Sequence, residues 1–164
     1  MRRLALLLAA GLALSGCGLR PLYADGNKGA AASMLSQISI APISGRDGWL
    51  VRTALVDRIG DHGDSARYRL EVKLDDQIQG LGLRSDATTT RERRTLRARY
   101  KLVDTVENRL VVDTTAGSDV GIDIVNSEYA TVAAEQTALE RLAERVADQI
   151  VTRIATGADK ASAQ

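Results

Sequence analysis

The chain has 164 residues, with 22 Lys and Arg against 21 Asp and Glu and a formal net charge of +1. This balance argues against a protein built mainly to bind nucleic acid, which carries a strongly basic field. Hydrophobic residues make up 45% of the chain and aromatic residues only 3%, which predicts a single core of Leu, Ile, Val and Ala. The chain has one Cys, so no disulfide can form within it.

Residues 1–16 have the order of a secretory signal peptide. Arg2 and Arg3 give a positive start, an apolar run covers residues 4–14, and small residues precede Cys17. The apolar run is too short for a transmembrane helix, which needs about 20 residues. No later segment approaches that length.

The end of this segment, Leu14-Ser15-Gly16-Cys17, resembles the lipobox of bacterial lipoproteins. The resemblance implies a diacylglycerol on the sulfur of Cys17, cleavage before it and acylation of the new N-terminus. Two or three acyl chains give stable membrane anchoring. The alternative is an ordinary secretory signal with a chance cysteine. In the usual sorting rule for such lipoproteins, Gly18 in place of Asp points to the outer membrane.

The first elements after the anchor are short. Residues 17–36 predict a lipidated tether, because they are rich in small and polar residues and show little periodicity. A domain is expected over 37–157, followed by a disordered tail over 158–164. Alternation predicts a strand over 38–41, and apolar residues at helical spacing predict a helix over 49–59.

Three longer strands are expected next. Strict alternation predicts a strand from Tyr68 to Asp75 that continues to Ile78, and Gly80-Leu81-Gly82 reads as a hairpin bend. A second strand covers about residues 88–103 and a third covers 109–116. Their short links predict an antiparallel meander. The inward residues of the second strand are Leu96, Ala98, Tyr100 and Leu102.

The last element is the clearest. Asn126 or Ser127 can cap a helix that ends at Gly157, with Glu128 at its positive end. The expected fold class is α+β, with two helices packed on one face of a four-stranded, mostly antiparallel sheet and a polar opposite face. The apolar stripe of the helix consists of Val132, Leu139, Leu142, Val146, Ile150 and Ile154.

Two stretches resemble the LPS-assembly lipoprotein family (LptE) in its alphaproteobacterial form. Cys17-Gly18-Leu19-Arg20-Pro21-Leu22-Tyr23 matches the family's opening, with Leu19 in place of the usual aromatic. Asn126-Ser127-Glu128-Tyr129-Ala130, followed by Ala133, Ala134 and Glu135, matches the start of its last helix.

This resemblance implies an outer-membrane lipoprotein that faces the periplasm. Such proteins sit as a plug inside a large β-barrel, the LPS-assembly protein LptD, and help to place lipopolysaccharide in the outer leaflet. The family fold is two helices on a four-stranded sheet. No ligand-contacting residue of the family could be matched to a position of this sequence.

A row of cations on the second long strand is the most unusual local feature. Arginine forks suit phosphate geometry, so this face predicts contact with the phosphates and sugar acids of lipopolysaccharide. Contact with acidic side chains inside the barrel is a second interpretation, and a solvated face with cross-strand ion pairs is a third. The candidates for binding lipopolysaccharide or the partner are Arg91, Arg93, Arg97, Arg99 and Lys101, with Arg67 and Arg69 on the neighbouring strand.

The sequence offers little for catalysis. His62 lies beside Asp61 and Asp64, but there is no second His, which argues against an ordinary zinc site and favours a solvated turn. We expect no catalytic residue, metal or cofactor. A lipoprotein of a lipid-transport ATPase system, a generic periplasmic binding lipoprotein and a periplasmic hydrolase remain alternatives. Trp49 is expected as a core or rim anchor, with contact to the barrel as the alternative.

Overall fold

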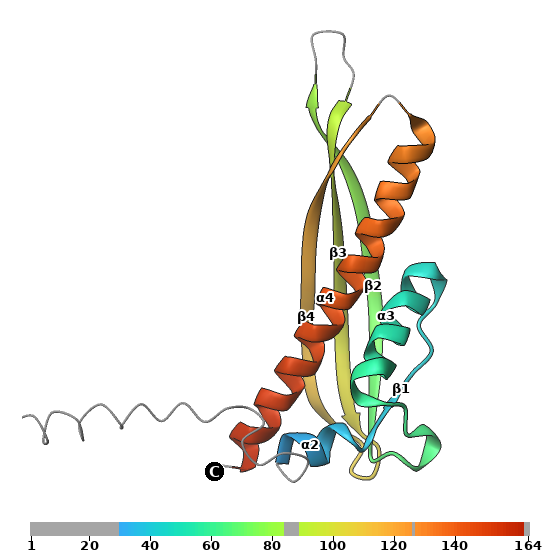
Figure 1. Ribbon diagram of the computed structural model, residues 1–164. Coiled ribbons are helices and arrows are strands. Elements are labelled where there is room, and N and C mark those ends of the chain that lie inside the picture. The colour runs from blue at the N-terminus through green and yellow to red at the C-terminus, as the bar shows by residue number, and fades with distance from the viewer. Residues whose placement is uncertain (1–29, 84–88, 126, 163–164) are drawn as a thin grey trace, which may run out of the picture.

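A computed structural model describes residues 30–83, 89–125 and 127–162. Figure 1 shows helices α3 and α4 lying against one face of a long sheet, with the short helix α2 beside the C-terminal end of α4. The expected α+β fold is therefore confirmed. The elements in chain order are α2 (Ala30–Leu35), β1 (Ile38–Ile40), α3 (Gly45–Ile59), the 3-10 helix η3 (Gly63–Ser65), β2 (Tyr68–Leu83), β3 (Thr89–Asp104), β4 (Arg109–Asp123) and α4 (Glu128–Ser162).

The four strands lie in the order β1-β2-β3-β4. Strand β1 pairs with β2 in parallel, and β2, β3 and β4 form the expected antiparallel meander. Strand β4 continues to Asp123, past the expected end at residue 116. Gly117 and Ser118 break the apolar alternation there, but their backbones still pair with β3.

The glycines at 80 and 82 do not form the expected bend. Gly80 and Leu81 belong to β2 and pair with Glu92 and Arg91 of β3. Glycine is a common turn signal, but here pairing along a long hairpin keeps the chain extended. The connection itself falls within residues 84–88, outside the described residues.

The core lies between the sheet and the helices. All four inward residues predicted for β3 are fully buried, at 0% exposure. They meet Val51 and Leu55 of α3 and the stripe of α4. Burying a side chain of this size contributes about 1.5–3 kcal/mol, so this layer supplies much of the stability.

The α4 stripe is buried at Leu139, Leu142, Val146, Ile150 and Ile154, whereas Val132 is 56% exposed. The inclusion of Val132 in the core was therefore wrong. Figure 1 shows the reason, because the first turns of α4 rise beyond the end of α3, so α3 does not cover them. None of the helices in the described part of the chain is both long and apolar enough to cross a bilayer.

Two boundaries differ from expectation. Helix α2 lies within the range predicted as a tether, and its Ala31 is buried while Met34 packs against the core. Six residues are too few to show helical periodicity, and tertiary contact stabilises such a short helix. Helix α4 continues through Gly157 to Ser162. A single glycine costs a helix only about 1 kcal/mol, so it did not end α4.

Candidate functional site

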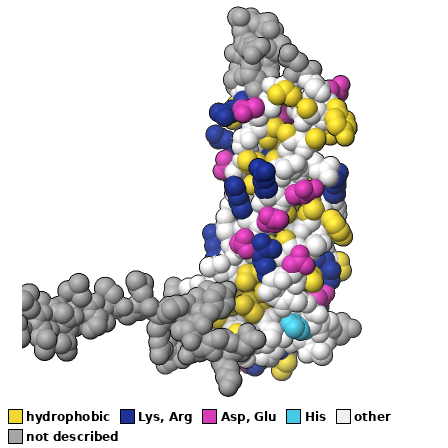
Figure 2. All heavy atoms as spheres, in the orientation of Figure 1, with side chains coloured by type: hydrophobic (Ala, Val, Ile, Leu, Met, Phe, Trp, Pro, Cys, Tyr) yellow, Lys and Arg dark blue, Asp and Glu magenta, His cyan; other side chains and the backbone are white. Residues whose placement is uncertain are grey.

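The sheet face away from the helices carries the predicted row of cations. On β3, positions 91, 93, 97, 99 and 101 are exposed, and they alternate with the buried residues of the core. On the opposite, helix-bearing side, which Figure 2 shows in the orientation of Figure 1, charges of both signs are interspersed. The cations of the row differ in whether a carboxylate lies beside them.

Strand β4 supplies carboxylates to most of the row. Arg91 Nε lies 3.0 Å from Asp123 Oδ1, and Arg93 Nε lies 3.7 Å from Asp119 Oδ2. Asp113 forms ion pairs with two cations of the row. Arg99 Nε lies 3.1 Å from Asp113 Oδ1, and Lys101 Nζ lies 3.9 Å from Asp113 Oδ2. The hydrogen bond from Arg99 lowers the pKa of Asp113 below its usual range. These pairs are exposed and screened by water, so they balance charge more than they add stability.

The acidic partners were not recognised from the sequence. Asp113, Asp119 and Asp123 lie at even spacings along β4, on the outward side that faces the row. The other outward positions there are Thr115, Gly117 and Gly121. Because side chains of a strand alternate between faces, this parity was a usable signal. Because the strand was expected to end at residue 116, Asp119 and Asp123 lay outside the predicted strand and were not assigned to its outward side.

Two cations on this face make no ion pair with any described residue, Arg97 and Lys73. Lys73 lies directly opposite Arg99 in the register of β2 and β3. Like charges directly opposite one another are unfavourable, so an anion that bridges them would be stabilising. Arg97 lies opposite Asp75, without a contact close enough for an ion pair.

Lys73 and Arg99 also border a groove of about 710 Å³. One wall comes from β1 and the segment after it, at Ser39, Ala41 and Pro42. The charged residues that line the groove are Arg69, Lys73, Arg99, Lys101, Glu71 and Asp61. Cations outnumber carboxylates there. Arg69 Nε lies 3.6 Å from Glu71 Oε1, so this carboxylate is already paired. The groove is thus the part of the outer face best suited to an anion.

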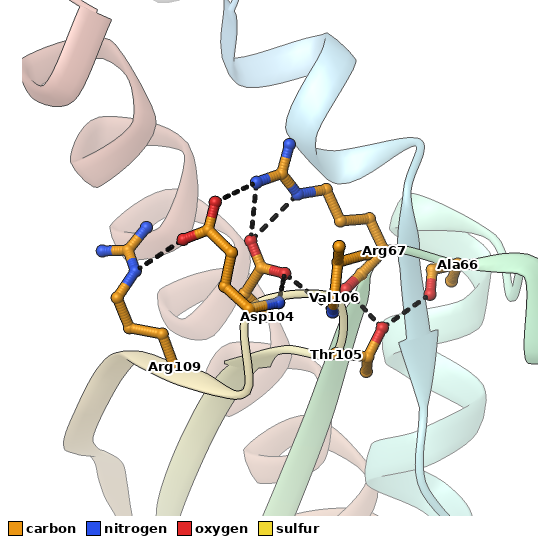
Figure 3. A network of polar contacts seen from close by, with 7 residues as sticks. Ala66, Arg67, Asp104, Thr105, Val106 and Arg109 are labelled. Carbon is orange, nitrogen blue, oxygen red and sulfur yellow. Dashed lines mark hydrogen bonds and ion pairs between the residues drawn. The ribbon is translucent and has the colours of Figure 1, made fainter.

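Arg67 has a different place from the one expected (Figure 3). Its Nε donates to Asp104 Oδ2 at 2.9 Å, and its Nη2 donates to Glu107 Oε1 at 3.1 Å. Asp104 is fully buried and also accepts the backbone N–H groups of Val106 and Glu107. The Arg67 guanidinium, helped by these amides, lowers the pKa of the Asp104 carboxyl. Arg67 therefore holds the turn between β3 and β4, and it is separate from the cation row.

His62 and Asp61, in the loop after α3, form contacts within the fold. The ring of His62 contacts the backbone carbonyl of Ile59 at 3.1 Å. The Asp61 carboxylate forms an ion pair with Arg52 and accepts the backbone N–H of Gly63. In the described part of the chain, no three His, Cys, Asp or Glu side chains come together in a way that could hold a metal ion.

Two further predicted residues remain. Trp49 is 63% exposed, so the prediction that it lies in the core was wrong, whereas a position at the rim agrees with this exposure. Cys17, the predicted lipid attachment site, lies outside the described residues.

Comparison with solved structures gives the same fold in other lipoproteins. A putative lipoprotein from Caulobacter crescentus CB15 aligns with a TM-score of 0.66 and 28% identity, over 81% of this chain and 98% of that one. A minor lipoprotein from Acinetobacter baumannii aligns with a TM-score of 0.58 and 14% identity, over 74% and 92% of the two chains. Rare lipoprotein B from Shewanella oneidensis aligns with a TM-score of 0.57 and 15% identity, over 77% and 98%.

The last two similarities concern the fold alone. No curated protein matches the chain by sequence. The model of the lipopolysaccharide-assembly family, LptE, matches residues 35–154, which include β1, α3, all three long strands and most of α4. The chain therefore belongs to the LptE family of lipopolysaccharide-assembly lipoproteins.

Proposed function

We propose that this lipoprotein is held in the outer membrane by acyl chains on Cys17, faces the periplasm, and serves as the plug and assembly partner of the LPS-assembly barrel LptD. Family membership and the lipobox resemblance at residues 14–17 support this function. The protein performs no reaction of its own. It supports folding of the barrel and contributes a surface to the passage of lipopolysaccharide.

The observation that carries the proposal is the two-sided construction of the sheet. Most apolar residues of α3 and α4 pack in the core on one face, with Trp49 and Val132 among the exposed exceptions. The other face is polar and carries the cation row of β3 with its carboxylate partners. An antiparallel sheet can leave one such face in water. In a barrel lumen, a wedge of this kind would offer polar contacts to the wall without needing an apolar lining.

The same construction argues against a carrier of free lipid. A shuttling lipoprotein needs an apolar cavity for acyl chains. The groove on the outer face has six charged residues in its lining beside apolar ones such as Ile40 and Val72, so acyl chains would lie against charges there. We propose that Lys73, Arg97 and Arg99 contact anionic groups, either lipopolysaccharide phosphates or carboxylates of the barrel. Both anions would be recognised by the same charge-assisted hydrogen bonds.

Affinity purification of the lipidated protein from outer membranes tests this function. A large β-barrel protein in stoichiometric amount is the expected companion. The Cys17→Ser variant, which cannot be acylated, should be lost from the membrane fraction. Recovery with an inner-membrane transporter, or full membrane retention of Cys17→Ser, would contradict the proposal.

A further inference from the structure

The outer edge of β4 is covered by helix α4 along only part of its length. At Gly117, the backbone N–H donates to Gln149 Oε1 and the carbonyl accepts from Gln149 Nε2, both at 3.2 Å. The carbonyl of Thr115 accepts from the guanidinium of Arg153. The Gln149 amide thus takes the place that a peptide group of a fifth strand would occupy.

The same edge is open further along the strand. Residues of an antiparallel strand turn their backbone groups alternately toward and away from the neighbouring strand. The backbone N–H and C=O of Gly117 point away from β3, toward Gln149. Because the register is regular up to Asp123, the backbone N–H and C=O groups of residues 119, 121 and 123 also point away from β3. No described residue forms a hydrogen bond with these backbone groups. The open segment Asp119–Asp123 is called the free edge below.

A groove of about 350 Å³ runs between the free edge and the first half of α4. The helix contributes small side chains here, at Ala133, Ala134 and Thr137, where Gln149 and Arg153 stand further along. Small residues leave room for another backbone beside β4. Arg141 also lines the groove and forms no ion pair with a described residue.

We propose that the free edge of β4 receives an extended segment of the barrel partner as an added strand. This inference rests on the proposed function. Five residues of strand correspond to about 17 Å of paired backbone. The incoming residues that face α4 are small and apolar, to fit beside Ala133 and Ala134, and a carboxylate meets Arg141.

Charge argues against a second copy of this chain as the occupant. Antiparallel self-pairing about Gly121 would set Asp119 of each copy directly opposite Asp123 of the other. Like charges directly opposite one another destabilise a strand pair. Charged residues on an edge strand are a common means of preventing such self-association. A heterologous strand with neutral or basic residues at these positions meets no such conflict.

Amide hydrogen exchange, measured on the lipoprotein alone and in its purified complex with the barrel, tests the inference directly. Alone, the amides of residues 119, 121 and 123 should exchange rapidly while those of 120 and 122 are protected by β3. In the complex, exchange at 119, 121 and 123 should slow by roughly 100-fold. The amide of Gly117, already bonded to Gln149, should change little.

Proline substitution gives the second measurement. Gly121→Pro removes an outward N–H without breaking the ladder to β3, and should weaken the complex by about tenfold. Thr115→Pro removes an equivalent outward N–H in the covered half and should leave the affinity unchanged. Ala134→Leu fills the groove without touching the backbone of β4, so it should reproduce the loss even if Gly121→Pro folds poorly.

The outcomes separate the two proposals. If the complex forms but residues 119, 121 and 123 still exchange rapidly, the added strand is excluded and the plug function stands. If no complex forms with the unaltered lipoprotein, the proposed function fails and the inference fails with it. Equal losses for Gly121→Pro and Thr115→Pro would also exclude a role specific to the free edge.

Discussion

Arg94 holds the Asp76 carboxylate through both its Nε and its Nη2, and its Nη1 donates to the backbone carbonyl of Glu135 at 2.7 Å. This ion pair lies on the inner face of the sheet, where the two side chains are 12% and 19% exposed. It connects β2, β3 and α4, the elements that contain Asp76, Arg94 and Glu135. The pKa of Arg94 is raised, chiefly by the hydrogen bond to Asp76.

Asp76→Ala should lower the free energy of unfolding by about 2 kcal/mol. The substitution leaves the largely buried Arg94 without its carboxylate, and an uncompensated charge is expensive where water is scarce. Urea denaturation followed by circular dichroism measures the change. Asp75→Ala is the matched control, because Asp75 directly precedes Asp76 in β2 but lies on the exposed face. A change of about 0.5 kcal/mol or less is expected there. Equal effects of the two variants would contradict the assigned role of Arg94.

Acid should destabilise the fold, partly through Asp104. Its pKa is lowered in the folded state by Arg67 and by the backbone amides of Glu107 and Val106. A lowered folded-state pKa contributes stability that is present above the unfolded value of about 4 and is lost as the pH falls below it. The midpoint of urea unfolding should therefore be nearly level from pH 7 to 5 and fall toward pH 3.

The Asp104→Asn variant isolates this contribution. Asparagine keeps a carbonyl acceptor for the turn amides but has no charge to pair with Arg67. The variant should therefore be less stable than the unaltered protein at pH 7, and its stability should fall less as the pH is lowered. Asp113 and Asp148 also have lowered pKa values, through hydrogen bonds from Arg99 and Arg58, so some acid dependence should remain. An unaltered acid profile in Asp104→Asn would mean that Asp104 contributes nothing to it.

Charge reversal on the outer face should weaken anion binding. Arg97→Glu and Lys73→Glu change the two cations that form no ion pair with described residues, so they alter the face without disrupting a pair. Each should reduce binding of purified lipopolysaccharide to the protein by roughly five- to tenfold at low salt, with a smaller effect at high salt.

The control for this experiment is Arg145→Glu. Arg145 is exposed on α4, away from the groove, and its reversal changes the net charge by the same amount. A loss as large in Arg145→Glu would indicate a general charge effect. Reversing Arg93, Arg97 and Arg99 together is a less clear test, because Glu at 93 and 99 would face Asp119 and Asp113. Unchanged binding in all single variants would favour the third interpretation of the row, a solvated face with cross-strand ion pairs.

Gln149→Ala should uncover the backbone of Gly117. Two hydrogen bonds disappear, so the protein should be destabilised by about 1 kcal/mol and the Gly117 amide should exchange faster. Gln136→Ala on the same helix serves as control, because among the described residues the Gln136 amide bonds only to the Glu140 side chain. Protection of Gly117 that survives in Gln149→Ala would mean that the side chain does not stand in for a strand.

The sequence alone determined the kinds of elements and the faces of most of them. The alternation around Leu96, Ala98, Tyr100 and Leu102 predicted the buried side of β3 correctly, because successive side chains of a strand point to opposite faces whatever the rest of the chain does. The stripe from Leu139 to Ile154 followed in the same way from helical spacing. These signals are local, so they can be read without knowing which elements meet.

Only the tertiary structure decided which charges are neutralised. The pairs Arg91–Asp123, Arg99–Asp113 and Arg67–Asp104 join residues far apart in the sequence, and their distances depend on strand register. Helix α2 and the uneven covering of the β4 edge likewise depend on how α4 lies across the core. Periodicity fixes the side of an element on which a residue lies. Its neighbours across the sheet are fixed by packing of the whole chain.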